Sequence, residues 1–415
     1  MEKKDKKLLG INGLGRIGKL TLWEQLRTRK FDGVVINVGR EVGRSAEALL
    51  QTLCSDSTYG RVEHFLYGST GFEKCKIEIV DRENLLFLID NFPIKILNKE
   101  RNPYRLNWKE ENVQIVIDCT GKFLDPTISN PDGNGDLRGH LVAGAQKVII
   151  SAPFKIKQPQ PESDTLFPTM IYGINHHEYQ PIQQHIISAA SCTTTALAHM
   201  MKPLLEDKET SHVLTASLST VHAATNSQSV LDSVPGSGSK DLRKNRSVLN
   251  NIILSSTGSA KTLEKVLPQV INFGFMADSI RIPTSTVSLI ALNITFTSSL
   301  NENKTPILNA EYIQNLYRNS AKNDPEKLLY YSEKQNVSMD MLGFPAAVVI
   351  EGNELHTRTG FLTVPTEILT SANIMLQEVN IPVTHAKIMG WYDNEYGSYV
   401  TSLCRLTEFV AARLY

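Results

Sequence analysis

One cysteine of the 415-residue sequence has the neighbours that a nucleophile needs. Cys192 lies in the run Ser191-Cys192-Thr193-Thr194-Thr195, between a strand-like segment at 185–190 and a segment of helical composition at 195–202. A thiol at a helix N-terminus has a lowered pKa, because the helix dipole stabilises the thiolate. The small hydroxyl residues beside it leave room for a substrate and can donate hydrogen bonds to oxyanions. Cys192 is therefore the candidate nucleophile.

A thiolate nucleophile needs a base, and His222 is the candidate for that role. It ends the strand-like run Leu218-Ser219-Thr220-Val221-His222. By itself, a histidine that closes a strand is more often a structural group than a catalytic one. Paired with Cys192, it would lower the thiol pKa through an ion pair and move the proton of the reaction. The other nine histidines have no comparable setting.

Near the N-terminus, three glycines predict a dinucleotide-binding turn. The strand-like segment Leu8–Asn12 leads into Gly13-Leu14-Gly15-Arg16-Ile17-Gly18, which opens a helix. Gly13 permits a tight turn, Gly15 lets the backbone approach a pyrophosphate, and Gly18 allows close packing of helix on strand. The helix N-terminus adds amide donors and the positive end of a dipole. The strand before the turn and the helix after it distinguish this motif from an ordinary glycine turn.

The second strand leaves the choice of cofactor open. An acidic residue about 20 positions after the motif would bind the adenosine ribose of NAD, but Val38 stands there and Arg40 follows it. The loss of the carboxylate removes repulsion toward a 2′-phosphate, and an arginine can pair with that group. Arg40 therefore favours use of NADP. The alternative is that Arg40 is a solvated loop residue and Glu41 binds the ribose.

These residues need a scaffold, and the hydrophobic pattern predicts an α/β fold for it. In the first half, short apolar runs alternate with helical patterns, which predicts a doubly wound, Rossmann-type parallel sheet. Its elements are expected at Leu8–Asn12, Arg16–Arg29, Val34–Val38, Ser45–Leu53, Val113–Cys119 and Lys147–Ser151.

After about residue 190 the chain becomes rich in Thr and β-branched residues, which predicts an α+β catalytic domain with a mainly antiparallel sheet covered on one face. Its strands are expected at His212–His222, Ser288–Ser298, Ala346–Ile350 and Thr384–Trp391, and a helical period returns over Ser398–Leu414. We expect a dinucleotide-binding domain at 1–191, a catalytic domain at 192–393, and a C-terminal helix at 394–415 that packs back onto the first domain.

Composition limits the class of protein. Acidic and basic residues balance at 43 each, so no net field favours nucleic acid or a membrane surface. The sequence has no signal-like or membrane-spanning apolar stretch, so we expect a soluble cytoplasmic protein. Five cysteines make no disulfide framework, and no metal site is expected. The four cysteines other than the nucleophile are interpreted as small buried hydrophobes: Cys54, Cys75, Cys119 and Cys404.

Several motifs in order along the chain resemble those of the glyceraldehyde-3-phosphate dehydrogenase family. The resemblance covers nearly the whole chain, and its cysteine and Trp-Tyr-Asp-Asn-Glu motifs are highly specific. The motifs are 11–18, Ser151-Ala152-Pro153, Ser191-Cys192-Thr193-Thr194, Thr220-Val221-His222-Ala223, Ser256-Thr257-Gly258, Arg281-Ile282-Pro283-Thr284 and Trp391-Tyr392-Asp393-Asn394-Glu395.

The resemblance implies a reaction and a role for each matching residue. Cys192 would attack an aldehyde, and His222 would take the proton as hydride passes to NAD or NADP. Inorganic phosphate would then cleave the thioacyl enzyme, so that glyceraldehyde 3-phosphate becomes 1,3-bisphosphoglycerate, reversibly, in glycolysis or gluconeogenesis. The implied substrate-phosphate residues are Thr225 and Arg281, those for the attacking phosphate Ser191, Thr193, Thr257 and Gly258, and those for the cofactor Gly13, Gly15, Arg16, Ile17, Gly18, Arg40, Thr120, Gly121 and Asn394. Arg243 and Arg246 fall in a stretch that forms a subunit interface in the family, whose members are homotetramers.

The sequence also departs from the family pattern. Ala196 stands where the family has a second cysteine, and Ser227 replaces an Asp near the substrate phosphate. Segments around 126–139, 155–164 and 323–365 resemble insertions, the first two of surface composition. Two alternatives therefore stay open: a dehydrogenase of another phosphorylated aldehyde such as erythrose 4-phosphate, and a non-catalytic protein that retains only the fold.

Overall fold

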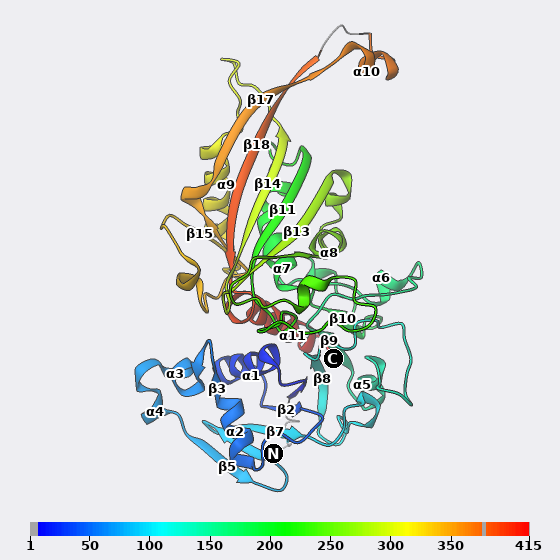
Figure 1. Ribbon diagram of the computed structural model, residues 1–415, viewed down its shortest axis with the longest axis vertical. Helices are drawn as coiled ribbons and strands as arrows, with labels where there is room; N and C mark the ends of the chain where they lie inside the picture. Colours follow the sequence, from blue (N-terminus) through cyan, green and yellow to red (C-terminus); the bar gives the residue numbers. More distant parts are fainter. Residues whose placement is uncertain (1–6, 376–378, 415) are drawn as a thin grey trace. The chain divides into compact units, whose positions relative to one another are not determined.

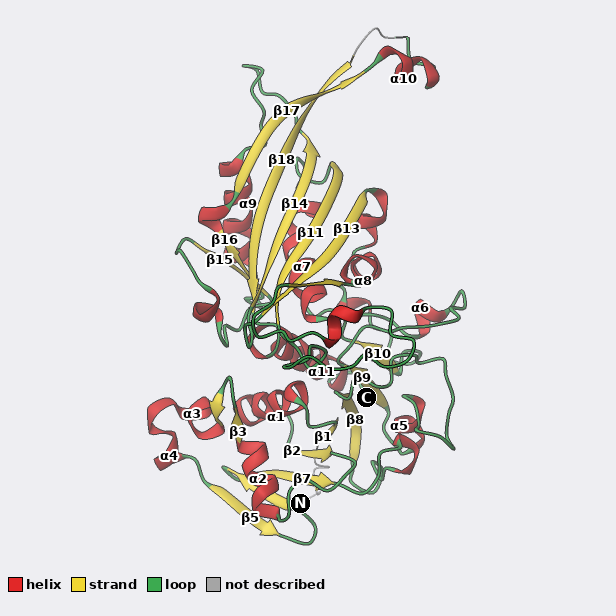
Figure 2. Cartoon of the chain, viewed as in Figure 1, coloured by secondary structure: helices red, strands yellow, loops and turns green. Residues whose placement is uncertain are grey.

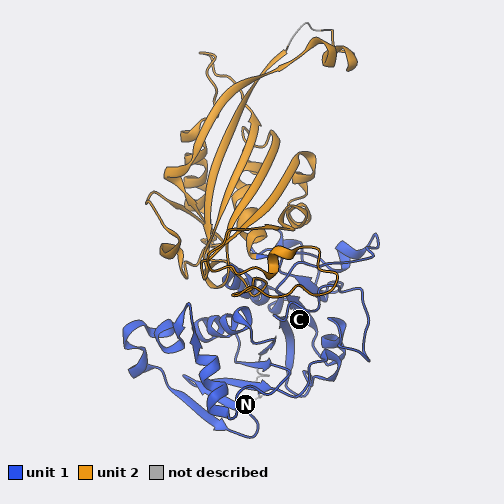
Figure 3. Cartoon of the chain, viewed as in Figure 1, with its two compact units in different colours: residues 1–191, 399–415 blue, residues 192–398 orange. Residues whose placement is uncertain are grey.

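The computed structural model describes residues 7–375 and 379–414 and divides the chain into two compact units (Figure 3). Unit 1 comprises Met1–Ser191 and Tyr399–Tyr415, and unit 2 comprises Cys192–Ser398. Each unit is built around one eight-stranded sheet.

The sheet of unit 1 has the strand order β10-β9-β8-β1-β2-β7-β6-β5. The six strands from β10 to β7 run parallel, which confirms the predicted parallel sheet, although no strand was predicted at the position of β7. Strands β1, β2 and β9 are buried almost throughout. Strands β6 and β5 extend the sheet as an antiparallel edge that the prediction lacks. The strands are β1 (Leu8–Asn12), β2 (Gly33–Asn37), β5 (Ile77–Asp81), β6 (Leu86–Ile89), β7 (Phe92–Leu97), β8 (Val113–Asp118), β9 (Lys147–Ile150) and β10 (Ile186–Ser188), with a separate hairpin of β3 (Ser55–Asp56) and β4 (Gly60–Arg61).

Helices connect and cover this sheet (Figure 2). They are α1 (Arg16–Thr28), α2 (Ala46–Cys54), α3 (Val62–Tyr67), α4 (Gly71–Lys74), α5 (Arg138–Val142), α6 (Ser163–Leu166) and α11 (Thr401–Ala411). Helix α11 contacts α1 and β8, so the C-terminal segment belongs to unit 1. The predicted helix over Ser398–Leu414 is shorter, because a π-helical turn at Tyr396–Val400 precedes α11.

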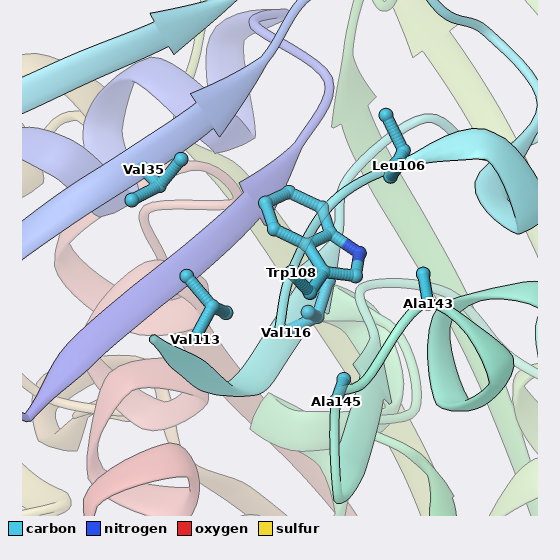
Figure 4. Close-up of a cluster of buried hydrophobic side chains, with 7 residues drawn as sticks. All are labelled: Val35, Leu106, Trp108, Val113, Val116, Ala143 and Ala145. Atoms are coloured by element: carbon cyan, nitrogen blue, oxygen red, sulfur yellow. The ribbon is translucent and has the colours of Figure 1, made fainter. Parts of the chain in front are cut away.

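A tryptophan marks the core on one side of the unit 1 sheet. The Trp108 side chain is fully buried among residues of β2, β8 and the α5–β9 connection (Figure 4). Its neighbours are Val35, Leu106, Val113, Val116, Ala143 and Ala145.

The first insertion-like segment, 126–139, lies between β8 and α5 and is only partly a surface loop. Residues 128–134 are exposed, but Asp136 and Leu137 are buried.

The sheet of unit 2 has the strand order β12-β13-β11-β14-β18-β16-β15, with β17 paired to β18. Its pairs are antiparallel except β11 with β13 and β15 with β16. The strands are β11 (Val213–Ala223), β12 (Ile253–Ser256), β13 (Gly274–Ile282), β14 (Ser288–Thr297), β15 (Leu329–Ser332), β16 (Val348–Glu351), β17 (His356–Val364) and β18 (Val379–Tyr392). The 323–365 segment thus supplies three strands of this sheet, and β17 and β18 form a long ribbon with α10 (Thr366–Ser371) beyond it (Figure 1).

One face of the unit 2 sheet is covered by helices. Alternate residues of β14 are buried, as its hydrophobic alternation predicts. Helix α7 (Cys192–Glu206) packs on β16 and β18, in contact with α8 (Ser259–Val266) and α9 (Ala310–Asn323). The approach of α7 is close, because a Cβ at Gly390 would lie 2.6 Å from the Met200 sulfur. In the described part of the chain, no helix is long and apolar enough to cross a membrane.

Candidate active site

The glycine turn after β1 has the geometry that the dinucleotide motif predicts. Gly13 has a φ of 100°, a conformation that favours glycine. A side chain at Gly18 would collide with the carbonyl oxygen of Gly13, so α1 lies directly against the turn. Beside Gly15, a Cβ would meet no atom within 4 Å. The turn therefore leaves open space at the N-terminus of α1, where phosphate oxygens can approach backbone amides.

The next two residues of the motif begin α1. The Arg16 guanidinium donates to Thr58 Oγ1 at 2.6 Å and lies 3.9 Å from the Asp56 carboxylate. Ile17 is half-buried in the first turn. Their backbone amides lie among the first residues of the helix, which have no intrahelical acceptor. These two backbone amides therefore make no helical hydrogen bonds at the turn.

A buried polar network lies beneath this turn. Asn37 donates to Asn12 Oδ1 at 2.8 Å, and Asn12 donates to Asp118 Oδ2 at 2.7 Å. His140 Nε2 lies 3.3 Å from the same Asp118 oxygen, and Trp108 Nε1 donates to His140 Nδ1 at 2.9 Å. An indole nitrogen can only donate, so Nδ1 of the imidazole accepts and its proton is on Nε2, facing the carboxylate. Every member of the network has a complementary partner.

The network holds the loops that follow three parallel strands. Asp118 Oδ1 accepts from the backbone and hydroxyl of Thr120, at 3.0 and 2.6 Å. Asn37 Oδ1 accepts from the amide of Gly39 at 3.1 Å, and the Asn37 carbonyl accepts from Gly13. Ligands of doubly wound sheets bind at this carboxyl edge of the strands. The network therefore fixes the backbone that a dinucleotide would contact.

These loops enclose a cavity of about 170 Å³ whose charged lining residues are all cations. Arg40 follows β2, Arg101 follows β7, and Lys122 follows β8. Arg101 Nε donates to the Gly39 carbonyl at 3.0 Å, which holds its guanidinium at the cavity. The remaining lining residues are Asn12, Gly13, Asn37, Val38, Gly39, Thr120 and Phe123. The cavity suits an anionic group at one end of a ligand.

In unit 2, Cys192 is the first residue of α7, as the strand-to-helix pattern predicts. The residue two positions earlier, Ala190, has a φ of 55°, which is uncommon for a residue other than glycine. Ala190 is held by a hydrogen bond from its amide to Ser188 Oγ at 3.1 Å. This sharp turn begins the helix at the thiol, whose residue is half-buried.

The second candidate residue lies next to the first. His222 is in β11, and its Nε2 is 3.6 Å from the Cys192 sulfur. In the parallel pair of β11 with β13, His222 stands opposite Arg281. The Arg281 Nη1 atom is 2.6 Å from His222 Nδ1 and donates to the Ala223 carbonyl at 3.2 Å. Thiol, imidazole and guanidinium thus form one contiguous cluster.

Burial opposes the charge separation that the sequence predicts for Cys192 and His222. Burial raises the pKa of the Cys192 thiol, although Arg281 and hydrogen bonds from Thr193 oppose the rise. Burial, and then the Arg281 charge, lower the pKa of His222 to about 4. Both shifts favour the uncharged form of each group, and the thiolate–imidazolium pair stays a prediction. The loss of water around two charges costs more than the neighbouring hydrogen bonds return.

Two hydrogen-bonded connections surround the cluster. The Tyr392 hydroxyl is 2.9 Å from the hydroxyls of both Thr193 and Thr220, which joins α7, β11 and β18. Ser288 Oγ accepts from the Ala223 amide at 3.1 Å and donates to Asn394 Oδ1 at 2.9 Å. Asn394 is buried, so its side chain is positioned through Ser288.

Other predicted phosphate residues lie in loops of their own. Thr225 bonds to Ser227 and Gln228, and Thr257 Oγ1 is 2.7 Å from Ser259 Oγ at the start of α8. Gly258 is the exposed residue before α8. Ser191 is the last residue of the first segment of unit 1. Among the side chains at 7–375 and 379–414, no three His, Cys, Asp or Glu residues gather as they would around a metal ion.

Comparison with known proteins identifies the family. Residues 7–126 match the model of the glyceraldehyde 3-phosphate dehydrogenase NAD binding domain, and residues 191–394 match that of the C-terminal domain. A glyceraldehyde-3-phosphate dehydrogenase of Bacteroides fragilis (strain YCH46) is 32% identical over 406 residues, covering 98% of this chain and 99% of the relative. One of Priestia megaterium (strain DSM 319 / IMG 1521) is 32% identical over 408 residues, covering 98% of each chain. The chain belongs to the glyceraldehyde-3-phosphate dehydrogenase family.

Membership of the glyceraldehyde-3-phosphate dehydrogenase family confirms the resemblance and the two-part α/β fold.

The interpretation of the four other cysteines as small buried hydrophobes is only partly right. Cys54 and Cys404 are buried, but Cys75 and Cys119 are partly exposed because they lie just after α4 and β8. Burial raises the pKa of the Cys119 thiol to about 12 even so.

Some residues of the two clusters escape the sequence prediction. Tyr392 lies inside the Trp-Tyr-Asp-Asn-Glu motif, which offered a signal for it. Arg101 follows β7, a strand that the hydrophobic pattern did not predict, so no sequence signal placed it near the end of the second strand. His140 had no signal, because its setting depends on Trp108 and Asp118, which are distant in the sequence.

Proposed function

We propose that the chain oxidises glyceraldehyde 3-phosphate to 1,3-bisphosphoglycerate, reversibly, with inorganic phosphate and a nicotinamide cofactor. The observation that carries the proposal is the 3.6 Å contact of the Cys192 sulfur, at the N-terminus of α7, with His222 Nε2. Membership of the family supports the reaction. The arrangement is that of a thiol nucleophile with a histidine base.

Arg281 supports a phosphorylated substrate. Its Nε is buried without a hydrogen-bond partner, and none of the ion pairs found in the described residues involves it. A guanidinium that has lost water without gaining a counter-ion favours an anion. We assign Arg281 and Thr225 to the substrate phosphate, and Ser191, Thr193, Thr257 and Gly258 to the attacking phosphate.

The chain's own residues account for the proton and acyl transfers. The Cys192 sulfur bonds to the aldehyde carbon, and the thiol proton passes through His222 to the carbonyl oxygen. His222 then removes that hydroxyl proton as the carbon is oxidised to a thioester, and a bound nicotinamide supplies the hydride acceptor. A phosphate oxygen next displaces the sulfur, which releases the acyl phosphate and returns the thiol.

The residues of unit 1 fit a dinucleotide. The open space at Gly15 suits a pyrophosphate, and the loop cavity beyond Gly13 suits the adenosine end. The cations Arg40, Arg101 and Lys122 support use of NADP as well as NAD, because a 2′-phosphate would neutralise them. The alternative ribose ligand, Glu41, is not among the cavity's lining residues. In unit 2, Asn394 is assigned to the nicotinamide carboxamide.

From the family resemblance alone, we also propose a cytoplasmic homotetramer. Another phosphorylated aldehyde, such as erythrose 4-phosphate, is the alternative substrate. Sedimentation of the purified chain would test the assembly, and the ratio of kcat/KM for the two aldehydes would decide between the substrates.

Steady-state kinetics with glyceraldehyde 3-phosphate, with and without inorganic phosphate and with each cofactor, test the reaction. We expect reduction of the cofactor to depend on phosphate and to release acyl phosphate, which hydroxylamine traps. Phosphate-independent formation of the free acid would contradict the phosphorylating reaction. Absence of cofactor reduction with either aldehyde would favour a protein that retains only the fold.

A further inference from the structure

Unit 2 contains a cavity of about 980 Å³ that the proposed reaction does not use. It is lined by the C-terminal part of α9, by β15 and by residues 333–344, which follow β15. Helix α9 contacts β15, the last strand of the unit 2 sheet (Figure 1). None of the residues assigned to the substrate, the phosphates or the cofactor lines this cavity. A cavity of this size accommodates a ligand as large as a mononucleotide.

Cations outnumber carboxylates in the lining, and both carboxylates already have partners. The charged lining residues are Arg318, Lys322, Lys327, Glu333, Lys334 and Asp340. Arg318 Nε donates to Glu333 Oε1 at 3.0 Å, so these two charges form an ion pair. Asp340 Oδ2 accepts from the Val337 amide at 2.8 Å. The charge that is left over in the cavity therefore belongs to the lysines.

The three lysines have no opposite charge beside them. They take part in none of the ion pairs found at 7–375 and 379–414. Within the same ranges, only the Lys327 ammonium has a hydrogen-bond partner, the backbone carbonyl of Lys322 at 3.3 Å. Three like charges around one cavity repel one another, and a bound polyanion would remove that repulsion.

Aromatic rings line the same cavity. Tyr330 and Phe344 lie with their ring centroids 4.9 Å apart at an angle of 63°, an edge-to-face contact that orients both rings. Tyr330 is nevertheless 45% exposed. An exposed ring beside several cations suits a nucleotide, because the base stacks on the ring and the phosphates accept hydrogen bonds from the ammonium groups.

An amide in the lining favours a ligand with sugar hydroxyls. Gln335 lines the cavity, and its side chain makes none of the hydrogen bonds found among the described residues. An amide both donates and accepts, which matches the hydroxyl groups of a ribose. Phosphotyrosine offers a ring and a phosphate without these hydroxyls, and an inorganic anion offers charge alone. The lining therefore fits a nucleoside phosphate better than either of them.

Hydrogen bonds hold the segment after β15 in place without a ligand. Asn336 Nδ2 donates to Glu351 Oε2 at 2.7 Å, and Trp391 Nε1 donates to the same oxygen at 2.9 Å. Farther along the segment, the Gly343 amide donates to Asp393 Oδ2 at 2.8 Å. The segment is thus fixed to β16 and to the end of β18. A wall that is already ordered lowers the entropy cost of binding.

We propose that this cavity is a binding site for a nucleoside phosphate, with the base against the Tyr330 ring and the phosphates at the three lysines. The site is separate from the dinucleotide turn of unit 1 and takes no part in the proposed reaction. Stacking on a tyrosine does not distinguish one base from another, so the ligand class is a nucleoside diphosphate or triphosphate of any base.

The test measures how fast each lysine of the full-length chain reacts with an acylating reagent, by mass spectrometry of its peptides. Because each position is measured separately, a nucleotide bound in unit 1 does not affect the result. We expect saturating ADP to slow the acylation of Lys322, Lys327 and Lys334 at least about fivefold, because bound phosphates cover the amines. The rate at Lys304, an exposed lysine elsewhere in unit 2, should not change. Unchanged rates at the three lysines would overturn the proposal.

Three further probes decide the class of ligand. Adenosine lacks the phosphates, inorganic pyrophosphate lacks the nucleoside, and phenyl phosphate represents phosphotyrosine. Each should need at least about a tenfold higher concentration than ADP for the same protection of the lysines, since each lacks one of the two kinds of contact. Protection by any of them at the same concentration as ADP would overturn the proposal, in favour of a site for uncharged nucleosides, for anions in general or for phosphotyrosine.

One variant tests the aromatic part of the site. Tyr330→Ala should raise the ADP concentration for half-maximal protection at least about fivefold and leave that for pyrophosphate unchanged, because only the base loses its contact. Tyr67→Ala, which removes an exposed tyrosine of unit 1, is the matched control and should behave as the wild type. An ADP affinity of Tyr330→Ala equal to that of the wild type would contradict the proposal.

The protection experiment does not depend on catalysis. Circular dichroism confirms that both variants are folded, and the wild-type measurements stand without them. A chain that oxidises glyceraldehyde 3-phosphate but shows no protection by ADP would refute the nucleotide site alone. A chain that shows the protection but makes no acyl phosphate would refute the proposed function alone.

Discussion

The two units carry polar clusters of similar size that differ in how their hydrogen bonds are satisfied. In unit 1, Trp108, His140, Asp118, Asn12 and Asn37 form a chain in which each donor meets an acceptor. The indole fixes the tautomer of His140, and all five side chains are buried. Such a network has one low-energy arrangement and serves to hold loops in place.

The cluster of unit 2 lacks that consistency. Two groups compete for His222 Nδ1 in opposite senses, and Arg281 Nε has no partner. Buried polar atoms are normally satisfied, so an exception of this kind points to a ligand or to catalysis. Unit 1 therefore holds a satisfied network beneath its dinucleotide turn, whereas the cluster of unit 2 has competing and unpaired donors that we infer a substrate would complete.

From this difference we expect substitutions in the unit 2 cluster to reduce catalysis and those in the unit 1 network to reduce stability. The largest expected effect is on catalysis. Cys192→Ser should reduce kcat/KM by at least about 10³-fold, because a serine hydroxyl in this site has no activated form. Its unfolding free energy should change by no more than about 1 kcal/mol, since oxygen in place of sulfur leaves the shape of the side chain nearly unchanged. Cofactor reduction and urea denaturation measure the two quantities.

Cys75→Ser is the control for this variant, because Cys75 is a partly exposed thiol in unit 1. It should retain activity near that of the wild type. Activity of Cys192→Ser within tenfold of the wild type would remove the unit 2 cluster from the mechanism.

Asp118→Asn should have a smaller effect, and mainly on stability. An amide has the shape of the carboxylate, but its NH₂ group would face donors on one side, from either Asn12 and His140 or Thr120. Leaving such donors unpaired should lower the unfolding free energy by about 1–3 kcal/mol. Affinity for NAD should also fall, because Thr120 loses its anchor.

Denaturant unfolding and cofactor titration check this prediction, with Asp132→Asn in an exposed turn as the matched control. If Asp118→Asn were as stable as that control, the unit 1 network would not hold the loops in place as the comparison requires.

Patterns local in the sequence predicted much of this structure. The glycine turn, the strand at Leu8–Asn12 and the start of α7 at Cys192 follow from short-range signals, because each depends on neighbouring residues. The antiparallel edge of β5 and β6 was missed, since those strands are short and lie outside the alternating strand–helix pattern. The ends of most predicted elements shifted by one or two residues. The exceptions are the C-terminal helix, which is three residues shorter at each end than predicted, and β18, which begins five residues early and pairs there with β17.

The residue types of the site could be predicted from the sequence, but the burial that shifts their pKa values could not. Spacing and family motifs placed Cys192 beside His222, yet the pKa of both depends on burial and on Arg281, a residue 59 positions from His222 in the sequence. The dipole at a helix N-terminus stabilises a thiolate, but the loss of water around the buried sulfur opposes this effect. The pKa values of a buried cluster depend on how distant segments pack around it, and neighbouring residues in the sequence do not determine that packing.

The smallest expected effect concerns the loop cavity of unit 1, where the charged side chains, unlike those of the network beside it, have no opposite charge among the lining residues. Arg40, Arg101 and Lys122 converge there without a carboxylate in the lining, so this corner resembles the unit 2 cluster more than the satisfied network beside it. If the comparison holds, these cations bind an anion of the ligand, and a dinucleotide would supply it as the 2′-phosphate of NADP.

Arg40→Ala should then weaken NADP binding by about three- to tenfold, as expected for one exposed charge-assisted contact. Binding of NAD should change little, and Arg44→Ala, an exposed arginine of the same loop, should affect neither cofactor. Dissociation constants from fluorescence titration measure all four combinations, and the difference between the cofactors should shrink as salt is added. Equal losses of affinity for both cofactors would instead mean that Arg40 stabilises the loop and does not recognise the 2′-phosphate. Its role would then be structural, like that of the hydrogen-bond network beside the cavity.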